Sequence, residues 1–254
     1  MTRRRIGAVT FDLWDCLFCD DTDEPKRKAA GLPPKPVARR DAFFRAVSRH
    51  ASIDRVVSDA AYDVMEAAFN KVWHDEHVTW RVAERMQVLL KGLRLALPED
   101  ELKALVSVYE TMELQYRPDP ALGAAEALRA LHGAYPLAVV SDTVYTPGWG
   151  LRELLKGAGM YSCFDCFVFS DEAGHSKPHP SVFEAVARHF GIAVGDIVHV
   201  GDRPHNDVGG PHAVGARAVL LTVVKQRPLD AHAPDAVCDD YAQLADIMAG
   251  LDAR

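Results

Sequence analysis

The sequence predicts an α/β fold, with a doubly wound, Rossmann-like parallel sheet and an inserted all-helical domain. Over residues 119–250, short apolar runs that end in small or polar residues alternate with amphipathic stretches. One further apolar run lies near the start of the chain, and the region after it contains only helical patterns. Alternating strands and helices give a parallel sheet covered on both faces, because crossovers between parallel strands are right-handed.

The expected strands are short and apolar, which is typical of strands buried on both faces of a parallel sheet. A long helical region separates the first strand from the others. We therefore expect one domain built from residues 1–18 and 117–254, and a second, all-helical domain from residues 19–116. The strands are expected at residues 6–11, 137–140, 167–169, 197–200 and 218–221.

Helices are expected where apolar residues recur at helical spacing beside residues that start or stop helices. Asp119 and Pro120 predict one such start. The apolar stripe that follows comprises Leu122, Leu128 and Leu131. In the inserted region, similar stripes should pack against one another as a small bundle. They lie around residues 43–47, 64–72, 86–93 and 102–112.

One expected helix, which follows the strand at residues 197–200, contains Gly209, Gly210 and Pro211 where its interior should lie. Proline lacks the N–H group that a helical hydrogen bond needs, and glycine is a poor helix former. This helix is therefore expected to begin late or to be kinked.

The composition is that of an ordinary globular protein, since 48% of the 254 residues are hydrophobic and 26% are charged. A formal net charge of -7 and the lack of an extended basic stripe argue against broad nucleic-acid binding. The sequence has no apolar run of the ~20 residues that a membrane span needs, and its first residues are too polar for a signal peptide. We expect a cytoplasmic protein with a small-molecule substrate.

Four of the five cysteines form two Cys-x-x-Cys pairs, Cys16 with Cys19 and Cys163 with Cys166. Such pairs can bind zinc. Here the first pair follows the end of one expected strand, whereas the second pair precedes another strand. In a parallel sheet these positions lie at opposite edges, roughly 20 Å apart. We therefore expect reduced cysteines and no shared zinc site.

Polar residues follow most of the expected strands, at the edge where open parallel sheets bind ligands. Several carboxylates at one edge repel each other unless a cation joins them, and Mg²⁺ prefers carboxylate oxygens. Any one of these residues could instead cap the helix that follows it. They are Asp12, Ser141 with Asp142, Asp171 and Asp202.

Four segments together resemble the ordered motifs of the haloacid dehalogenase-like hydrolase superfamily. The inserted helices match the cap domain that those enzymes carry between their first and second motifs. The resemblance covers nearly all of the chain and implies a Mg²⁺-dependent hydrolase, a phosphatase acting on a small phosphorylated metabolite. The segments are Phe11-Asp12-Leu-Trp-Asp-Cys-Leu17, Val-Val-Ser141-Asp142, Ser176-Lys177-Pro178-His-Pro180 and Val-Gly201-Asp202-Arg-Pro-His-Asn206-Asp207.

The resemblance makes Asp12 the nucleophile. Asp12 would form an aspartyl phosphate, which divides one difficult displacement into two easier ones. Ser141, Asp142 and Lys177 are the expected substrate-binding residues. The Lys177 ammonium would also keep Asp12 ionised and offset the charge of a phosphoryl group.

The expected cofactor is Mg²⁺. By resemblance, Asp12, Asp202 and the backbone carbonyl of Trp14 would hold it. Asp207 would bind a ligating water or orient Asp202. Without the cation, a carboxylate nucleophile would face an anionic substrate across electrostatic repulsion.

Position 14 departs from the phosphatase pattern, in which a second aspartate two residues after the nucleophile carries a proton. Trp14 cannot do so, and such acid–base catalysis contributes roughly 10²- to 10⁴-fold to a rate. Asp15 is the nearest candidate to replace it. His175 and His205, in loops expected near the site, are further candidates.

Two other functions stay open. The 2-haloacid dehalogenases of the superfamily also carry an aromatic residue at this position, and they need neither the metal nor the second aspartate. The segment that contains Asp202 and Asp207 favours the phosphatase, because those dehalogenases lack its metal-binding form. A non-catalytic binding protein with the same fold is the third reading. In each case the cap would close over the site and select the ligand.

Overall fold

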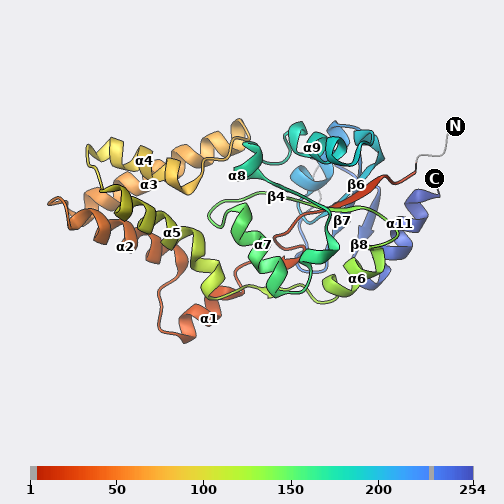
Figure 1. Cartoon of the computed structure of the whole chain (residues 1–254), viewed down its shortest axis with the longest axis horizontal. Helices are drawn as coiled ribbons and strands as arrows, with labels where there is room; N and C mark the ends of the chain where they lie inside the picture. The colour runs from red at the N-terminus through yellow and green to blue at the C-terminus, as the bar shows by residue number, and fades with distance from the viewer. Residues whose placement is uncertain (1–4, 229–231, 254) are drawn as a thin grey trace.

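A six-stranded parallel sheet, with helices around it, forms the right-hand part of the molecule in Figure 1. The computed structural model describes residues 5–228 and 232–253. The strands lie in the order β5-β4-β1-β6-β7-β8. The α/β fold predicted from the sequence is confirmed. The strands are β1 (Ala8–Phe11), β4 (Leu137–Ser141), β5 (Cys166–Phe169), β6 (Ile197–Gly201), β7 (Arg217–Leu221) and β8 (Ala236–Cys238).

The strand order reverses at β1. The chain places β4 on one side of β1 and then returns to place β6 on the other, so that Val9 pairs with both Leu137 and Val198. Crossovers that leave a strand in opposite directions open a crevice at its carboxyl end, where open α/β sheets bind ligands. Asp12 is the first residue after β1, and the topology therefore puts it at this crevice.

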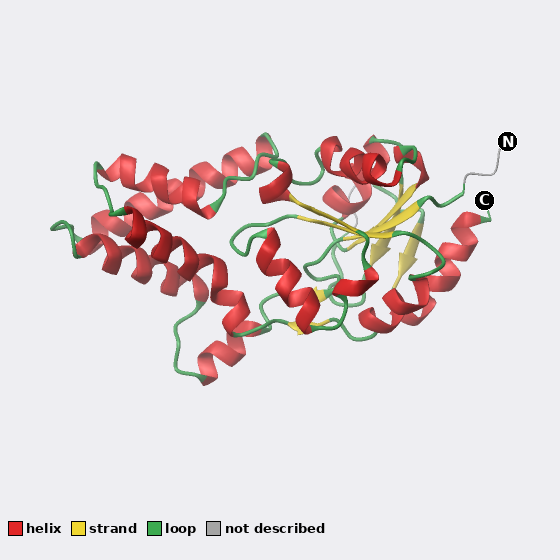
Figure 2. Ribbon diagram, in the orientation of Figure 1, coloured by secondary structure: helices red, strands yellow, loops and turns green. Residues whose placement is uncertain are grey.

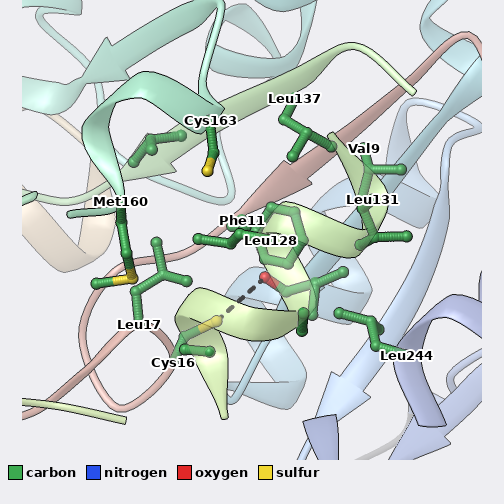
Figure 3. Close-up of a cluster of buried hydrophobic side chains, with 14 of the residues drawn as sticks. Val9, Phe11, Cys16, Leu17, Leu128, Leu131, Leu137, Met160, Cys163 and Leu244 are labelled. Atoms are coloured by element: carbon green, nitrogen blue, oxygen red, sulfur yellow. Dashed lines mark hydrogen bonds between the residues drawn. The ribbon is translucent and has the colours of Figure 1, made fainter. Parts of the chain in front are cut away.

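Helices cover both faces of the sheet. Val9 and Phe11 point to one face and pack with Leu128 and Leu244, whereas Ala8 packs with Val182 and its neighbours on the other face (Figure 3). Burying a side chain such as Phe11 completely stabilises the fold by about 1.5–3 kcal/mol. The helices are α6 (Ala124–Leu131), α7 (Gly148–Gly157), α8 (Ser170–Ala173), α9 (Pro180–Phe190), α10 (Gly210–Ala213) and α11 (Leu244–Asp252).

The region between β2 (Phe18–Cys19) and β3 (Asp119–Pro120) is helical and gathers at one side of the sheet (Figures 1 and 2). Phe43, Met86 and Tyr109 belong to a buried apolar cluster that is separate from those of the sheet. Asp54 caps one of these helices by accepting a hydrogen bond from the Val56 amide at 2.7 Å. The helices are α1 (Asp23–Ala29), α2 (Lys35–Ser48), α3 (Arg55–Asp75), α4 (Val82–Leu93) and α5 (Glu99–Gln115).

The predicted helix start at Asp119 is wrong. Asp119–Pro120 forms a short strand, β3, which pairs antiparallel with β2 (Phe18–Cys19). Leu122, expected on the buried stripe, is 91% exposed. The helix α6 begins only after Gly123, whose φ of 84° is a conformation that glycine adopts without strain. Strand pairing has thus displaced the helix start by several residues.

The helix after β6 begins early, contrary to the expectation of a late start. A π-helical segment, Pro204–Gly209, runs directly into α10. Pro211 has no N–H to donate to the preceding turn, and wide π turns accommodate such gaps in the hydrogen-bond ladder. The regular α-helix is therefore disrupted as expected, but the disruption takes the form of a wider, π-helical turn and not of a later helix start. This geometry places Asp207 on the wide turn.

The two cysteine pairs lie where the sequence predicted. Cys16 follows the end of β1, and Cys166 begins β5. All five cysteines are free. Separately, no helix among the described residues is both long enough and apolar enough to cross a membrane.

Candidate active site

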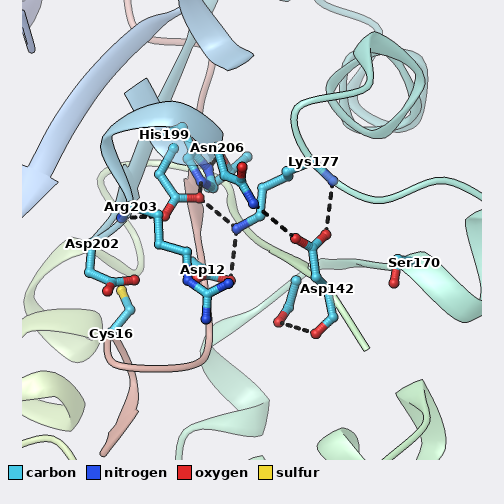
Figure 4. A network of polar contacts seen from close by, with 12 residues as sticks. Asp12, Cys16, Asp142, Ser170, Lys177, His199, Asp202, Arg203 and Asn206 are labelled. Atoms are coloured by element: carbon cyan, nitrogen blue, oxygen red, sulfur yellow. Dashed lines mark hydrogen bonds and ion pairs between the residues drawn. The ribbon is translucent and has the colours of Figure 1, made fainter. Parts of the chain in front are cut away.

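The carboxyl edge of the sheet gathers the residues predicted from the sequence. Asp12 follows β1, Ser141 ends β4 with Asp142 behind it, and Asp202 follows β6. The Asp12 amide donates a hydrogen bond to the Val200 carbonyl at 2.9 Å, which fixes the start of the turn after β1. Figure 4 shows Asp12, Asp142 and Asp202 around Lys177, which comes from the loop between α8 and α9.

Lys177 is the central cation of this cluster. Its Nζ lies 2.8 Å from Asp12 Oδ1 and 2.7 Å from Asp207 Oδ1. Burial lowers the pKa of Lys177, but the carboxylates of Asp12, Asp207 and Asp142 outweigh that effect and hold its pKa above the usual value. The ammonium therefore stays charged and offsets two buried carboxylates.

Asp207 is held from several sides. Besides Lys177, its carboxylate accepts a hydrogen bond from the Arg203 amide at 2.8 Å and lies 3.2 Å from His199 Nε2. Burial would raise the pKa of Asp207, yet Lys177 and His199 hold it well below its usual range. A Cβ on Gly201 would approach the Asp207 carboxyl carbon to 2.4 Å, so this position needs glycine.

Asp202 completes a set of donors that fits a divalent cation. Oxygens of Asp12, Asp202 and Asp207 all lie within 4.8 Å of one another. Asp202 Oδ1 is buried and has no hydrogen-bond partner in the structure, and burial together with Asp12 raises the pKa of Asp202 to about 7. Clustered carboxylate oxygens with one unsatisfied acceptor suit Mg²⁺, which takes oxygen ligands.

The turn after β1 separates Trp14 from Asp15. Trp14 lines the same cavity as Asp12. Asp15, whose φ is 52°, instead makes ion pairs with Arg227 at 2.9 Å and Lys225 at 3.3 Å. Arg227 also lies 2.5 Å from Asp202, so its guanidinium bridges the two carboxylates. The structure therefore directs Asp15 toward Arg227.

Asp142 and Asp171 accept hydrogen bonds from different parts of the structure. Asp142 lines the cavity and accepts a hydrogen bond from the Lys177 amide at 2.8 Å, and burial raises its pKa to about 6 although Lys177 lowers it. Ser141 donates to the Asp142 carbonyl at 3.4 Å. Asp171 accepts from the Gly148 amide at 3.1 Å and from Thr143 at 3.1 Å, and so caps α7. The sequence had allowed Asp171 to cap the helix that follows it, whereas the structure has it accept from the first residue of α7, a helix that precedes it in the chain.

A cavity of about 250 Å³ lies between the sheet edge and the helical region. Asp12 and Trp14 line it from the sheet, and Arg39 of α2 and Trp73 of α3 line it from the helices. A neighbouring cavity of about 510 Å³ shares Trp73 and is also lined by His205. His175 stacks on His179 with the ring centroids 3.9 Å apart.

Asp20 is a cavity residue that the sequence did not single out. It lines the cavity beside Asp12, in the turn that follows β2. Burial, with the nearby charges of Asp21 and Glu113, raises the pKa of Asp20 to about 6. A carboxyl group that titrates near neutral pH can both give and take a proton.

Two arginines, Arg227 and Arg39, were also not identified from the sequence as residues of this site. Arg227 lies in a loop that carries no motif, so the sequence offers no signal for it. Arg39 does have a signal, because it lies four residues before the buried Phe43 and therefore on the apolar stripe of α2. A charged residue on a core-facing stripe indicates a partner or a ligand.

Comparison with known proteins agrees with this geometry. The haloacid dehalogenase-like hydrolase profile matches residues 6–215. Human haloacid dehalogenase-like hydrolase domain-containing protein 3 is 34% identical over 98% of this chain and 95% of its own length. A glyceraldehyde 3-phosphate phosphatase from Methanopyrus kandleri is 26% identical over 97% of this chain and 98% of its own length.

A solved structure gives the same fold. The 2-haloacid dehalogenase from Pseudomonas syringae pv. Tomato superposes with a TM-score of 0.70 at 20% identity, over 96% of this chain and 99% of that chain. At 20% identity this similarity shows a shared fold and nothing about function. Together with the profile match over most of the chain, it leads to one assignment. The chain belongs to the haloacid dehalogenase-like hydrolase family and is a hydrolase.

Proposed function

We propose that this hydrolase is a Mg²⁺-dependent phosphatase that acts on a small phosphate monoester through an aspartyl phosphate on Asp12. The observation that carries the proposal is the buried cluster of Asp12, Lys177, Asp202 and Asp207. Relatives named as phosphatases support the same reaction, among them the protein from Methanopyrus kandleri. In this proposal residues 19–116 form the cap and residues 1–18 and 117–254 form the catalytic core.

Asp12 is the nucleophile in this mechanism. Lys177 Nζ lies 2.8 Å from one of its oxygens and places a positive charge beside the carboxylate. Attack on phosphorus forms the aspartyl phosphate and releases the alcohol, and water then hydrolyses the acyl phosphate to free phosphate. Ser141, at the end of β4, is positioned at the same edge to donate to a phosphoryl oxygen.

The metal site of the proposal consists of Asp12, Asp202 and the Trp14 carbonyl, with Asp207 behind them. When bound there, Mg²⁺ would offset the negative charge that otherwise repels the substrate from Asp12. The neighbouring Arg203 adds a further positive charge, because the carboxylates of Asp12 and Asp202 raise its pKa although burial lowers it.

The phosphatase reading can be tested against its two alternatives with one pair of assays. With Mg²⁺, the protein should hydrolyse p-nitrophenyl phosphate, and chelation with EDTA should abolish the activity until Mg²⁺ is restored. It should release no chloride from 2-chloropropionate. Chloride release without metal would instead assign it to the dehalogenases, the function that Trp14 favours. Inactivity in both assays would favour a binding protein.

We further propose that Asp20 carries the proton that Trp14 cannot. Asp20 shares the cavity with Asp12, whereas Asp15 is held by Arg227 and Lys225. Its pKa is raised by burial, Asp21, Glu113 and Asp15 and lowered by Lys35, to about 6. The protonated form donates to the leaving alcohol, and the ionised form then accepts a proton from water.

Asp20→Asn should therefore lower kcat/KM for an alkyl phosphate by about 100-fold, within the range of acid–base catalysis. In the parent protein kcat/KM for this substrate should fall as the pH rises above about 6, because Asp20 loses its proton. The variant should lose that dependence. kcat/KM for p-nitrophenyl phosphate should change little, since nitrophenolate leaves without a proton and this constant does not report the later hydrolysis of the aspartyl phosphate.

Two matched variants complete this test. Asp21→Asn removes the same charge from the neighbouring position, where the side chain is 74% exposed. It should keep most of the kcat/KM for the alkyl phosphate and retain a pH-dependent fall, shifted to lower pH because the Asp21 charge helps to raise the pKa of Asp20. If Asp15→Asn shows the alkyl-specific loss while Asp20→Asn does not, the proton carrier is Asp15.

A further inference from the structure

Arg39 is a buried cation that faces the catalytic cavity without a counter-charge. It is 6% exposed and lines the same cavity as Asp12. Its guanidinium lies over the Tyr145 ring, 3.3 Å from the centroid, and its Nε has no hydrogen-bond partner. Within residues 5–228 and 232–253, no ion pair includes this side chain.

Two other buried cations close to this cavity, both lysines, are paired. Lys35, on the same helix, lies 2.8 Å from Asp23 and 3.3 Å from Glu113. Lys177 lies between two carboxylates. Arg39 therefore differs from these two lysines in its lack of a partner and not in its burial.

A stacked tyrosine does not replace a counter-charge. A guanidinium carries five N–H donors in a planar fork, and a ring face satisfies none of them. Burial of a charge without an anion or hydrogen bonds is costly, so such groups persist mainly where a ligand supplies them. Because Arg39 lines the cavity, a ligand bound there lies beside this side chain.

The acidic residues of the cavity do not cancel this charge. Glu113 lies against Lys35 at 3.3 Å and accepts a hydrogen bond from Thr146 at 2.5 Å. Asp21 lies 3.5 Å from Lys35. For Asp20, which also lines the cavity, Lys35 is again the cation that lowers the pKa against the effect of burial. The carboxylates on this side of the cavity thus have Lys35 as their cation, and Arg39 is left for an anion from outside the chain.

We infer that Arg39 binds a carboxylate on the alcohol portion of the substrate, which makes the substrate a short phosphorylated hydroxy acid. This inference rests on the proposed phosphatase function. The guanidinium fork matches a carboxylate through two parallel hydrogen bonds. The cavity of about 250 Å³ lies below the usual ~300–1,000 Å³ of ligand pockets and must also hold the phosphoryl group, which favours a small anion on a short chain.

The test compares 3-phosphoglycerate with glycerol 3-phosphate, which carries a hydroxymethyl group in place of the carboxylate. The parent protein should have the higher kcat/KM for 3-phosphoglycerate. Arg39→Gln should lower that value by about 10- to 100-fold, the effect of losing hydrogen bonds to a charged group, and change glycerol 3-phosphate by less than about threefold. Arg39→Lys retains the charge without the fork and should fall between the two.

Arg40→Gln is the matched control. Arg40 is the next residue of α2, its side chain is 31% exposed, and it pairs with Asp63. This variant should keep the parent preference. Thermal unfolding of each variant shows whether Arg39 also stabilises the fold, and Arg39→Lys keeps the test usable if Arg39→Gln does not fold.

Two results would overturn the inference. One is equal kcat/KM for both esters in the parent protein, and the other is an equal loss for both in Arg39→Gln. Hydrolysis of p-nitrophenyl phosphate separates these from failure of the phosphatase proposal, because that activity does not need Arg39. In Asp12→Asn protein, which can bind without turnover, calorimetry should show weaker binding of 3-phosphoglycerate once Arg39→Gln is added.

Discussion

Asp12→Asn should lower the turnover of every phosphate ester by roughly 10³-fold or more, which is typical of losing a covalent nucleophile. An amide is a far weaker nucleophile than a carboxylate and cannot form the aspartyl phosphate. The variant should remain folded, since Lys177 keeps its contact with Asp207 at 2.7 Å. Steady-state kinetics with p-nitrophenyl phosphate and Mg²⁺ measure the loss, and circular dichroism monitors the fold.

Asp171→Asn is the control for this change. Asp171 also follows a strand of the sheet, but its carboxylate caps α7 through the Gly148 amide. Its replacement should leave kcat within a few-fold and cost about 0.5–2 kcal/mol of stability at most, as for the loss of a helix cap. Equal losses of activity in both variants would show that the Asp12 effect is structural. Full turnover by Asp12→Asn would remove Asp12 from the nucleophile position.

The sheet could be predicted because its strands are buried on both faces and read as continuous apolar runs, such as that of β6. Short edge elements carry no such pattern. β8 has three residues, and Val237 in it is 50% exposed, so the sequence did not predict this strand. The pairing of Phe18 with Pro120 could not be predicted from the sequence either, because it depends on where the helical insertion begins and ends.

The site residues that the sequence predicted each stand at a strand end or within a recognisable segment. Asp12 and Asp202 are examples, since both directly follow strands. The site residues that were not predicted from the sequence come from segments that only the tertiary fold brings to the site. Arg227 approaches Asp202 from a loop beyond β7, and Arg39 faces the cavity only because α2 lies across it. Periodicity can predict that Arg39 lies on the buried side of its helix, but it cannot predict that a cavity lies there.

Lys177→Met should produce the largest loss of stability, about 3–5 kcal/mol in the free energy of unfolding. The change removes the ammonium from two carboxylates that are 4% and 0% exposed, Asp12 and Asp207. Removing one partner of a buried pair leaves the other charge uncompensated, and that penalty exceeds the value of the pair itself. Denaturant unfolding in metal-free buffer measures the loss.

A double-mutant cycle with Asp207→Asn tests whether this loss is electrostatic. In Lys177→Met/Asp207→Asn one of the unpaired charges is gone, while the Arg203 amide can still donate to the asparagine oxygen. The double variant should therefore be less destabilised than the sum of the single variants, by about 1–3 kcal/mol, as for residues in direct contact. Lys156→Met, on the exposed face of α7, should hardly change the unfolding curve.

The same cycle separates the structural role of Lys177 from its role in catalysis. If the double variant recovers stability but no turnover, Lys177 acts on the substrate as well as on the fold, as expected for a cation beside the nucleophile. Strictly additive losses would mean that the 2.7 Å contact between Lys177 and Asp207 contributes no coupling energy. In that case the pair could not be what holds Lys177 against Asp12, and the electrostatic basis of the proposed site would fail.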